Sequence, residues 1–259
     1  MKDKVMMKKP LSAKEIDLIT RLEFYGKDVY GKKEIISFCK DSKLAAYLIK
    51  KLLEKGRLRK IIKNLYLFVP MKAPGGLWSG NEYLIAKALA RGANYYIGYA
   101  TVFNSYGFTD QVPQLIQVVN DKYSIRKTFL GVRYKLIKVL PNRFYGLEIR
   151  KIKNEDVVFP KKERAMIDVF EFYDIRKAFA ILKAQSAKLD MPLFVEYLAK
   201  YPVLRVRRRV GFFLEKLGVE QKLLNRIEVG EKGYTPLYDT GSNKGEINMS
   251  DMFNKFGVS

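Results

Sequence analysis

The stretch DSKLAAYLIKKLLEKGRLRKIIKNLYLFV, residues 41–69, decides the fold of the N-terminal part of this chain. Asp41 and Ser42 are residue types that begin helices, leucines recur after them at helical spacing, and Gly56 ends the helix. Residues 57–69 predict two short strands joined by a turn. A helix followed directly by a basic hairpin is the second half of a winged helix-turn-helix, whose helix enters the DNA major groove.

Two more helices are expected upstream, at residues 12–25 and 32–39, and they complete a winged helix-turn-helix domain over residues 1–69. The sequence PMKAPGG, at residues 70–76, is rich in proline and glycine, so we expect residues 70–80 to be a linker. Residues 81–259 then form a second domain.

The second domain is expected to have three parts. A small mixed sheet with helices covers residues 81–160, a helical segment covers 161–228, and an extended tail covers 229–259. The fold class is therefore α+β. Expected helices lie at 81–91, 100–106, 161–172, 176–188, 192–200, 203–217 and 220–226, and expected strands at 95–99, 115–120, 132–139, 146–152 and 155–159.

The chain of 259 residues is strongly basic, with a formal net charge of +22. The excess is densest in residues 1–69, which hold 18 basic and 8 acidic residues, a net charge of +10. Double-stranded DNA attracts such a surface, because Lys and Arg neutralise phosphates and release counterions. A generic solubility surface is the alternative interpretation of the charge.

Nine residues are candidates for DNA contact. The helix at 41–55 has an inner leucine face and an outer polar face, and the outer face of its N-terminal half is the part that meets base edges. The basic side chains of the hairpin would lie on phosphates or in the minor groove. The candidates are Ser42, Lys43, Ala46, Tyr47 and Lys50 on the helix, and Arg57, Arg59, Lys60 and Lys63 on the hairpin.

A second basic surface is possible on the helix expected at 203–217. Its apolar residues fall on one face, and the other face would carry basic side chains around an exposed Phe212. A solvated helix exterior is the alternative. The basic residues are Arg205, Arg207, Arg208, Arg209 and Lys216.

The composition argues against an enzyme. The chain has no histidine and a single cysteine, Cys39, so it offers no Cys/His zinc site and no histidine base. It also lacks glycine-rich phosphate loops. We expect no catalytic residue, no metal and no cofactor. An endonuclease-like enzyme docked by its winged helix is the alternative, although Glu148 and its neighbours lack the lysine that a carboxylate–metal nuclease site needs.

Three segments of the second domain resemble one family. YYIGYATVFNSYGFTDQVP at 95–113 resembles the signature YYIS…SAL…HGLT-Q-P of the AbiEi-type antitoxins, the "transcriptional regulator of viral defence" proteins, with Tyr106 in the histidine position. FYG at 144–146 with FPKKERAMID at 159–168 is similar to the family's FFG…P-EKTLLD, and VRRRVGFFLEKLG at 206–218 is similar to its RRLGYLLE-LG.

This resemblance implies an antitoxin of a type IV toxin–antitoxin, or abortive phage infection, system. The winged helix would bind inverted repeats in double-stranded DNA upstream of its own operon and repress it. The second domain would counter a toxin that resembles a nucleotidyltransferase. We expect a cytoplasmic protein with no membrane partner, because no window of 18 apolar residues and no secretory signal occur.

Overall fold

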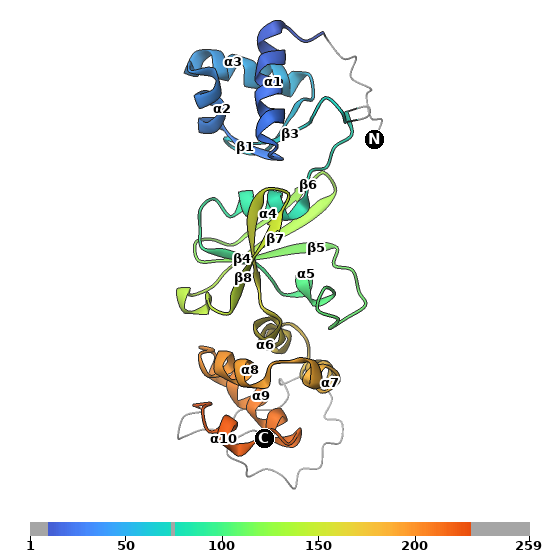
Figure 1. Ribbon diagram of the computed structural model, residues 1–259, viewed down its shortest axis with the longest axis vertical. Coiled ribbons are helices and arrows are strands. Elements are labelled where there is room, and N and C mark those ends of the chain that lie inside the picture. Colours follow the sequence, from blue (N-terminus) through green and yellow to red (C-terminus); the bar gives the residue numbers. More distant parts are fainter. Residues whose placement is uncertain (1–9, 74–75, 229–259) are drawn as a thin grey trace.

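The computed structural model describes residues 10–73 and 76–228 of the chain. They form an α+β fold stacked in three layers along the long axis of the molecule, as expected (Figure 1). A winged helix is the first layer, β-sheet structure with two helices is the middle layer, and helices form the third. The tail expected at 229–259 lies outside the described residues.

The winged helix contains three helices and a three-stranded antiparallel sheet of order β1-β3-β2. Leucine and isoleucine side chains from the helices and from this sheet form its core, among them Leu18, Leu22, Ile35 and Leu52. The elements are α1 (Ala13–Tyr25), β1 (Val29–Gly31), α2 (Lys32–Cys39), α3 (Ser42–Glu54), β2 (Leu58–Ile62) and β3 (Leu65–Phe68).

Local chemistry fixes the ends of α1 and α3. Ser12 and Glu15 form a capping box at the start of α1. Asp41 caps α3, since its Oδ1 accepts bonds from the backbone N–H groups of Lys43 and Leu44 at 2.7 and 3.3 Å. The two helices are joined by Lys55, whose Nζ lies 2.6 Å from the Oε2 of buried Glu15. These contacts set the position of α3 against α1.

The middle layer contains a four-stranded sheet of order β4-β5-β7-β6 and a separate antiparallel ribbon of β8 and β9. In the sheet, β5 and β7 are parallel, whereas β6 is an antiparallel edge strand on β7. The elements are α4 (Glu82–Leu89), β4 (Tyr95–Ile97), α5 (Ala100–Phe103), β5 (Leu115–Asn120), β6 (Ile125–Phe129), β7 (Val132–Lys138), β8 (Leu147–Ile152) and β9 (Glu155–Pro160).

Two details of the middle layer differ from the sequence expectation. Strand β6 was not expected, because polar residues fill its centre and give it no continuous apolar run. The ribbon of β8 and β9 was expected to complete one sheet, yet it pairs only with itself among the described strands. The expected helices at 81–91 and 100–106 are shorter than predicted, since Gly92 and Gly107 follow frayed last turns.

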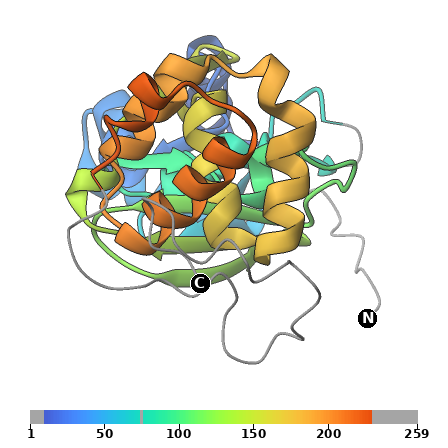
Figure 2. The same cartoon turned by 90° about the horizontal axis from the view of Figure 1, so that it is seen from below.

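The third layer consists of helices that cover the lower side of the sheets (Figure 2). Its core is continuous with that of the middle layer. The helices are α6 (Lys162–Phe172), α7 (Ile175–Gln185), α8 (Met191–Ala199), α9 (Leu204–Lys216) and α10 (Gln221–Leu224). Short 3-10 turns lie at Pro141–Arg143 and Ser186–Lys188.

Helix α9 does not present the basic face that the sequence predicts. It packs against α6, α8 and α10, so it is covered on several sides. Arg208 and Arg209 are each only 5% exposed, and Phe212 is buried instead of exposed. Arg207 is half-buried, and only Arg205 and Lys216 lie at the surface. The prediction was wrong for most of this surface because a helical wheel assumes burial on one side.

The winged helix is joined to the middle layer through Asp28. This buried carboxylate accepts a bond from the backbone N–H of Asn81 at 2.8 Å and one from Lys153 Nζ at 2.5 Å. Apolar side chains of the wing strands, Ile61 and Leu67, belong to the core of the middle layer. The first two layers therefore share an interface that contains both apolar and charged contacts.

Candidate nucleic-acid interface

The outer face of α3 carries all five residues predicted to touch DNA bases. Ser42, Lys43, Ala46, Tyr47 and Lys50 are exposed, and the ring of Tyr47 belongs to a residue that is 55% exposed. The inner face buries Ala45, Leu48, Ile49 and Leu52 against the rest of the winged helix. The structure thus brings the predicted residues together on one open helix surface in the position of a recognition helix.

Two lysines give this face its positive charge. Among the described residues, no carboxylate lies within 4 Å of Lys43 or Lys50. The neighbouring Lys51 differs, because its Nζ lies 3.2 Å from Glu54 and over the ring of Tyr47 at 5.8 Å. The hydrogen bond to Glu54 raises the pKa of Lys51. Lys43 and Lys50 are therefore the cations best placed for an anionic ligand.

The wing, the hairpin of β2 and β3, supplies two of the four predicted basic contacts. Lys60 and Lys63 are exposed. Arg57 is 8% exposed and donates from Nη1 to the carbonyl oxygen of Pro70 at 2.9 Å, so its prediction as a DNA contact was wrong. Arg59 is half-buried and donates to the carbonyl oxygen of Gly76 at 2.9 Å. These two arginines hold the segment after β3 against the winged helix.

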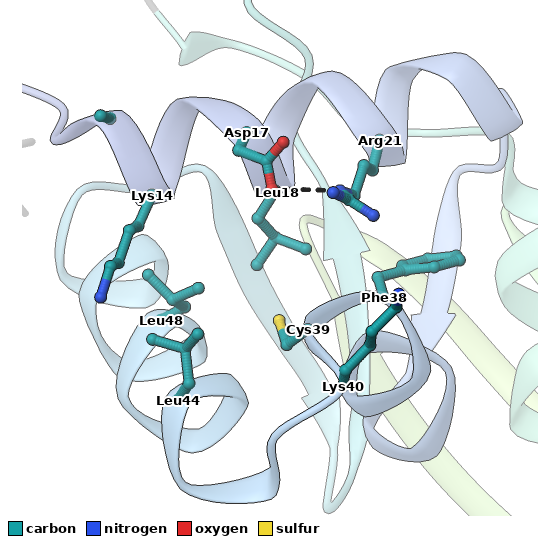
Figure 3. A pocket seen from close by; sticks show the side chains of 10 residues that line it. Lys14, Asp17, Leu18, Arg21, Phe38, Cys39, Lys40, Leu44 and Leu48 are labelled. Carbon is teal, nitrogen blue, oxygen red and sulfur yellow. Dashed lines mark hydrogen bonds and ion pairs between the residues drawn. The ribbon is translucent and has the colours of Figure 1, made fainter.

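A cleft of about 430 Å³ lies behind the recognition face, between α1, α2 and the inner side of α3. Figure 3 shows Lys14 running beside Leu44 and Leu48, and the sulfur of Cys39 facing Leu18. Burial raises the pKa of the Cys39 thiol, which keeps the thiol protonated and unreactive. Nothing in the sequence predicted this cleft.

The segments that resemble the antitoxin family meet at a buried arginine in the second domain. Arg164 is fully buried, its Nη1 lies 2.6 Å from Asp168 Oδ1, and its Nη2 donates to the hydroxyl of Tyr96 at 3.2 Å. The guanidinium carbon also lies 5.3 Å from the ring centroid of Tyr145 and 5.0 Å from that of Tyr201. We call these five residues the Arg164 cluster.

A second ion pair adjoins the Arg164 cluster. Arg143 pairs with Glu171 and contacts the hydroxyl of Tyr201, and Tyr99 donates to Glu171 at 3.1 Å. Burial raises the pKa of Glu171, and Arg143 opposes that shift only in part. The motif residues thus bind one another inside the domain, and the surrounding ring of tyrosines excludes water from them.

Tyr106, which stands at the histidine position of the resembled family, is also bound within the domain. Its hydroxyl donates to the carbonyl oxygen of Pro160 and accepts from Arg150 Nη2 at 2.5 Å. This contact joins the loop after α5 to the end of β9.

No protein-family model matches the chain, and neither does any curated protein. A solved structure does: the Rv2827c protein of Mycobacterium tuberculosis aligns with a TM-score of 0.64 at 14% sequence identity, over 96% of this chain and 92% of that one. At this identity the match shows a common fold over all three layers.

Two surveys of side-chain composition complete the description. Within residues 10–73 and 76–228, no three His, Cys, Asp or Glu side chains gather closely enough to hold a metal ion. In the same ranges, none of the helices has the length and apolar character needed to cross a membrane.

Proposed function

We propose that this protein is a DNA-binding transcriptional autorepressor and the antitoxin of a type IV toxin–antitoxin system, cytoplasmic, acting against a nucleotidyltransferase-like toxin. The observation that carries the DNA-binding half is the open face of α3, where Lys43 and Lys50 flank Ala46 and Tyr47 with no acidic partner among the described residues. Lysine can donate to guanine O6 and N7, and the alanine methyl can contact the thymine methyl.

The wing supports the same proposal. Lys60 and Lys63 are exposed on the hairpin that follows the recognition helix, where a winged helix contacts phosphates or the minor groove. Such contacts add affinity for any sequence, while those of α3 select the sequence. The two sets of residues therefore have separable roles.

The antitoxin half of the proposal rests on the resemblance of the three motif segments. The contacts of the Arg164 cluster give these segments a structural role, because they hold the middle and third layers together. The toxin-facing surface would then be formed by the outside of those layers.

A footprint on the DNA upstream of the protein's own gene tests the autorepressor. Wild-type protein is expected to protect an inverted repeat. Lys43→Ala with Lys50→Ala should abolish that protection, whereas Lys183→Ala with Lys188→Ala, an equal loss of charge on exposed residues of the third layer, should retain it. Absence of a protected site with the wild-type protein would refute autorepression.

Coexpression with the neighbouring gene of the operon tests the antitoxin. The proposal expects that gene to encode a growth-inhibiting nucleotidyltransferase-like protein and expects the wild-type chain to restore growth. Lys43→Ala with Lys50→Ala should still restore growth when expressed from an unrelated promoter. Failure of the wild-type chain to restore growth would remove the antitoxin role and leave DNA binding unaffected.

A further inference from the structure

The β6–β7 ribbon carries a row of positive charge that the function proposed above does not use. Residues 122–138 contain six basic residues and no acidic one. Strands β6 and β7 pair so that Arg126 lies opposite Lys135, and Thr128 lies opposite Arg133. Since directly opposed residues of an antiparallel pair point to the same face, these four side chains share one face of the ribbon.

This face is open to solvent. Arg126, Thr128 and Arg133 are exposed and Lys135 is half-buried. The opposite face of the ribbon supplies Phe129, Tyr134 and other side chains to the core. The basic face is therefore held by a buried apolar face, and its three cations are presented on a regular strand pair instead of a loop.

The arrangement has an energetic cost in the isolated protein. Like charges directly opposite one another on antiparallel strands destabilise the pair, and Arg126 and Lys135 are such a pair. In the part of the chain that the structure describes, no carboxylate lies within 4 Å of Arg126, Arg133 or Lys135. An anion bound across the two strands would remove this repulsion.

We propose that the basic face of the β6–β7 ribbon binds the phosphate backbone of double-stranded DNA next to the site read by the winged helix. The inference rests on the proposed DNA-binding function and extends it. Figure 1 shows β6 at the side of the middle layer that faces the winged helix. DNA held by α3 is therefore near this edge of the sheet.

Duplex DNA fits this face better than a protein does. Protein interfaces are centred on aromatic and other apolar side chains and are poor in lysine. The ribbon face offers three cations and a threonine hydroxyl, with Ile137 half-buried at its end. Arginine, lysine and threonine are the side chains that bind phosphate oxygens. The contact would add affinity without sequence preference.

The test compares two duplexes and three proteins. The short duplex ends at the outermost bases whose substitution weakens wild-type binding, and the long one extends it by about 10 bp, one helical turn, on each side. The ribbon variant is Arg126→Gln, Arg133→Gln and Lys135→Gln. Its matched control removes three exposed lysines of the third layer, Lys183, Lys188 and Lys200, in the same way.

The ribbon variant is expected to bind the short duplex like wild type and the long duplex on the order of tenfold to a hundredfold more weakly. Its slope of log affinity against log salt on the long duplex should be smaller by about 2 to 3, because each phosphate contact contributes about 0.9. The control should match wild type on both duplexes. The melting temperature of the ribbon variant should equal or exceed that of wild type, since the repulsion is gone.

Other results would overturn the inference. If the ribbon variant binds the long duplex like the control, the ribbon does not contact DNA, while the proposed function stands. If the variant instead loses binding only to single-stranded RNA of equal length, the face belongs to a different nucleic acid. If wild-type protein binds neither duplex, the proposed function and the inference both fail.

Discussion

The outer face of α3 and the Arg164 cluster use charged residues in opposite ways. On α3, Lys43 and Lys50 are exposed, and no carboxylate among the described residues neutralises them. In the cluster, Arg164 is fully buried, pairs with Asp168, and lies among three tyrosine rings. The first arrangement leaves its charge available to a ligand, and the second consumes its charge within the fold.

This difference separates binding residues from structural residues more reliably than residue type does. A buried ion pair has lost its hydration, so each partner depends on the other. An exposed lysine keeps its hydration until a phosphate or base displaces the water. The contrast therefore predicts large stability effects for one region and binding effects without stability effects for the other.

Arg164→Met should produce the largest effect. It leaves the buried carboxylate of Asp168 without its cation, which costs about 3–5 kcal/mol of unfolding free energy. Urea denaturation followed by circular dichroism measures the loss. The double variant Arg164→Met with Asp168→Leu should be less destabilised than the single one, because no charge is left unpaired. A single variant within about 1 kcal/mol of wild type would contradict a tightly coupled pair.

Lys43→Ala with Lys50→Ala should leave unfolding unchanged and weaken specific DNA binding, by about 1–3 kcal/mol for each base that the variant no longer reads. Gel shifts on the operator and on a scrambled duplex measure the two affinities. The loss of affinity for the operator should exceed the loss for the scrambled duplex. Equal losses on both would mean that α3 contacts phosphates alone and that the comparison of the two regions needs a different reader of sequence.

Glu15 predicts a pH-dependent stability within the winged helix. Burial alone would raise its pKa, but the bonds from Lys55 and Ser12 outweigh burial and hold the pKa below its ordinary 4.5. A lowered pKa stabilises the fold above the unfolded-state value, and that stabilisation is lost as the pH falls through the lowered value. Wild type should therefore lose stability on acidification more steeply than Glu15→Gln, in thermal melts between about pH 5 and pH 3.

The control for Glu15 is Asp17→Asn. Asp17 pairs with Arg21 on the same helix, but both side chains are about half exposed, so this pair contributes little. Its acid profile should follow that of wild type. Identical profiles for Glu15→Gln and wild type would show that the Lys55 contact does not couple to folding.

The wing should produce the smallest effect. Lys63→Ala is expected to weaken binding to operator and scrambled duplexes equally and to reduce the salt slope by about 1, the contribution of one phosphate contact. Arg57→Met should instead lower the melting temperature, because the variant cannot bond to the carbonyl of Pro70 and Arg57 does not face solvent. A reversed pattern, with Arg57 affecting DNA and Lys63 affecting stability, would invert the assignment of the wing.

The winged helix could be predicted from sequence almost completely. Its helices have local signals, such as the Asp41 cap and the leucine spacing of α3, and their observed ends agree with the prediction within two residues. The edge strand β6 could not be found, because an edge strand with one basic face lacks an apolar run. The separate ribbon of β8 and β9 depends on long-range pairing that no local pattern encodes.

The candidate site was predictable where exposure follows from helical geometry. All five residues chosen on α3 are exposed, because one face of that helix packs on the core and the other does not. Arg57, Arg208 and Arg209 were misjudged because their burial comes from tertiary contacts with Pro70 or with helices of the third layer. The ribbon face had a sequence signal, six basic residues without an acidic one, but no expected strand to order it.

The contacts of Asp28 and the wing bear on how the two halves of this protein can be studied. Cutting the chain between them would expose Ile61 and Leu67 on one piece and their apolar partners on the other, and would leave Lys153 without its carboxylate. Truncated fragments would then be prone to self-association, and a missing activity could reflect that alone. Point substitutions on the open faces keep the junction intact, so they are the sounder route to assigning each activity to its half.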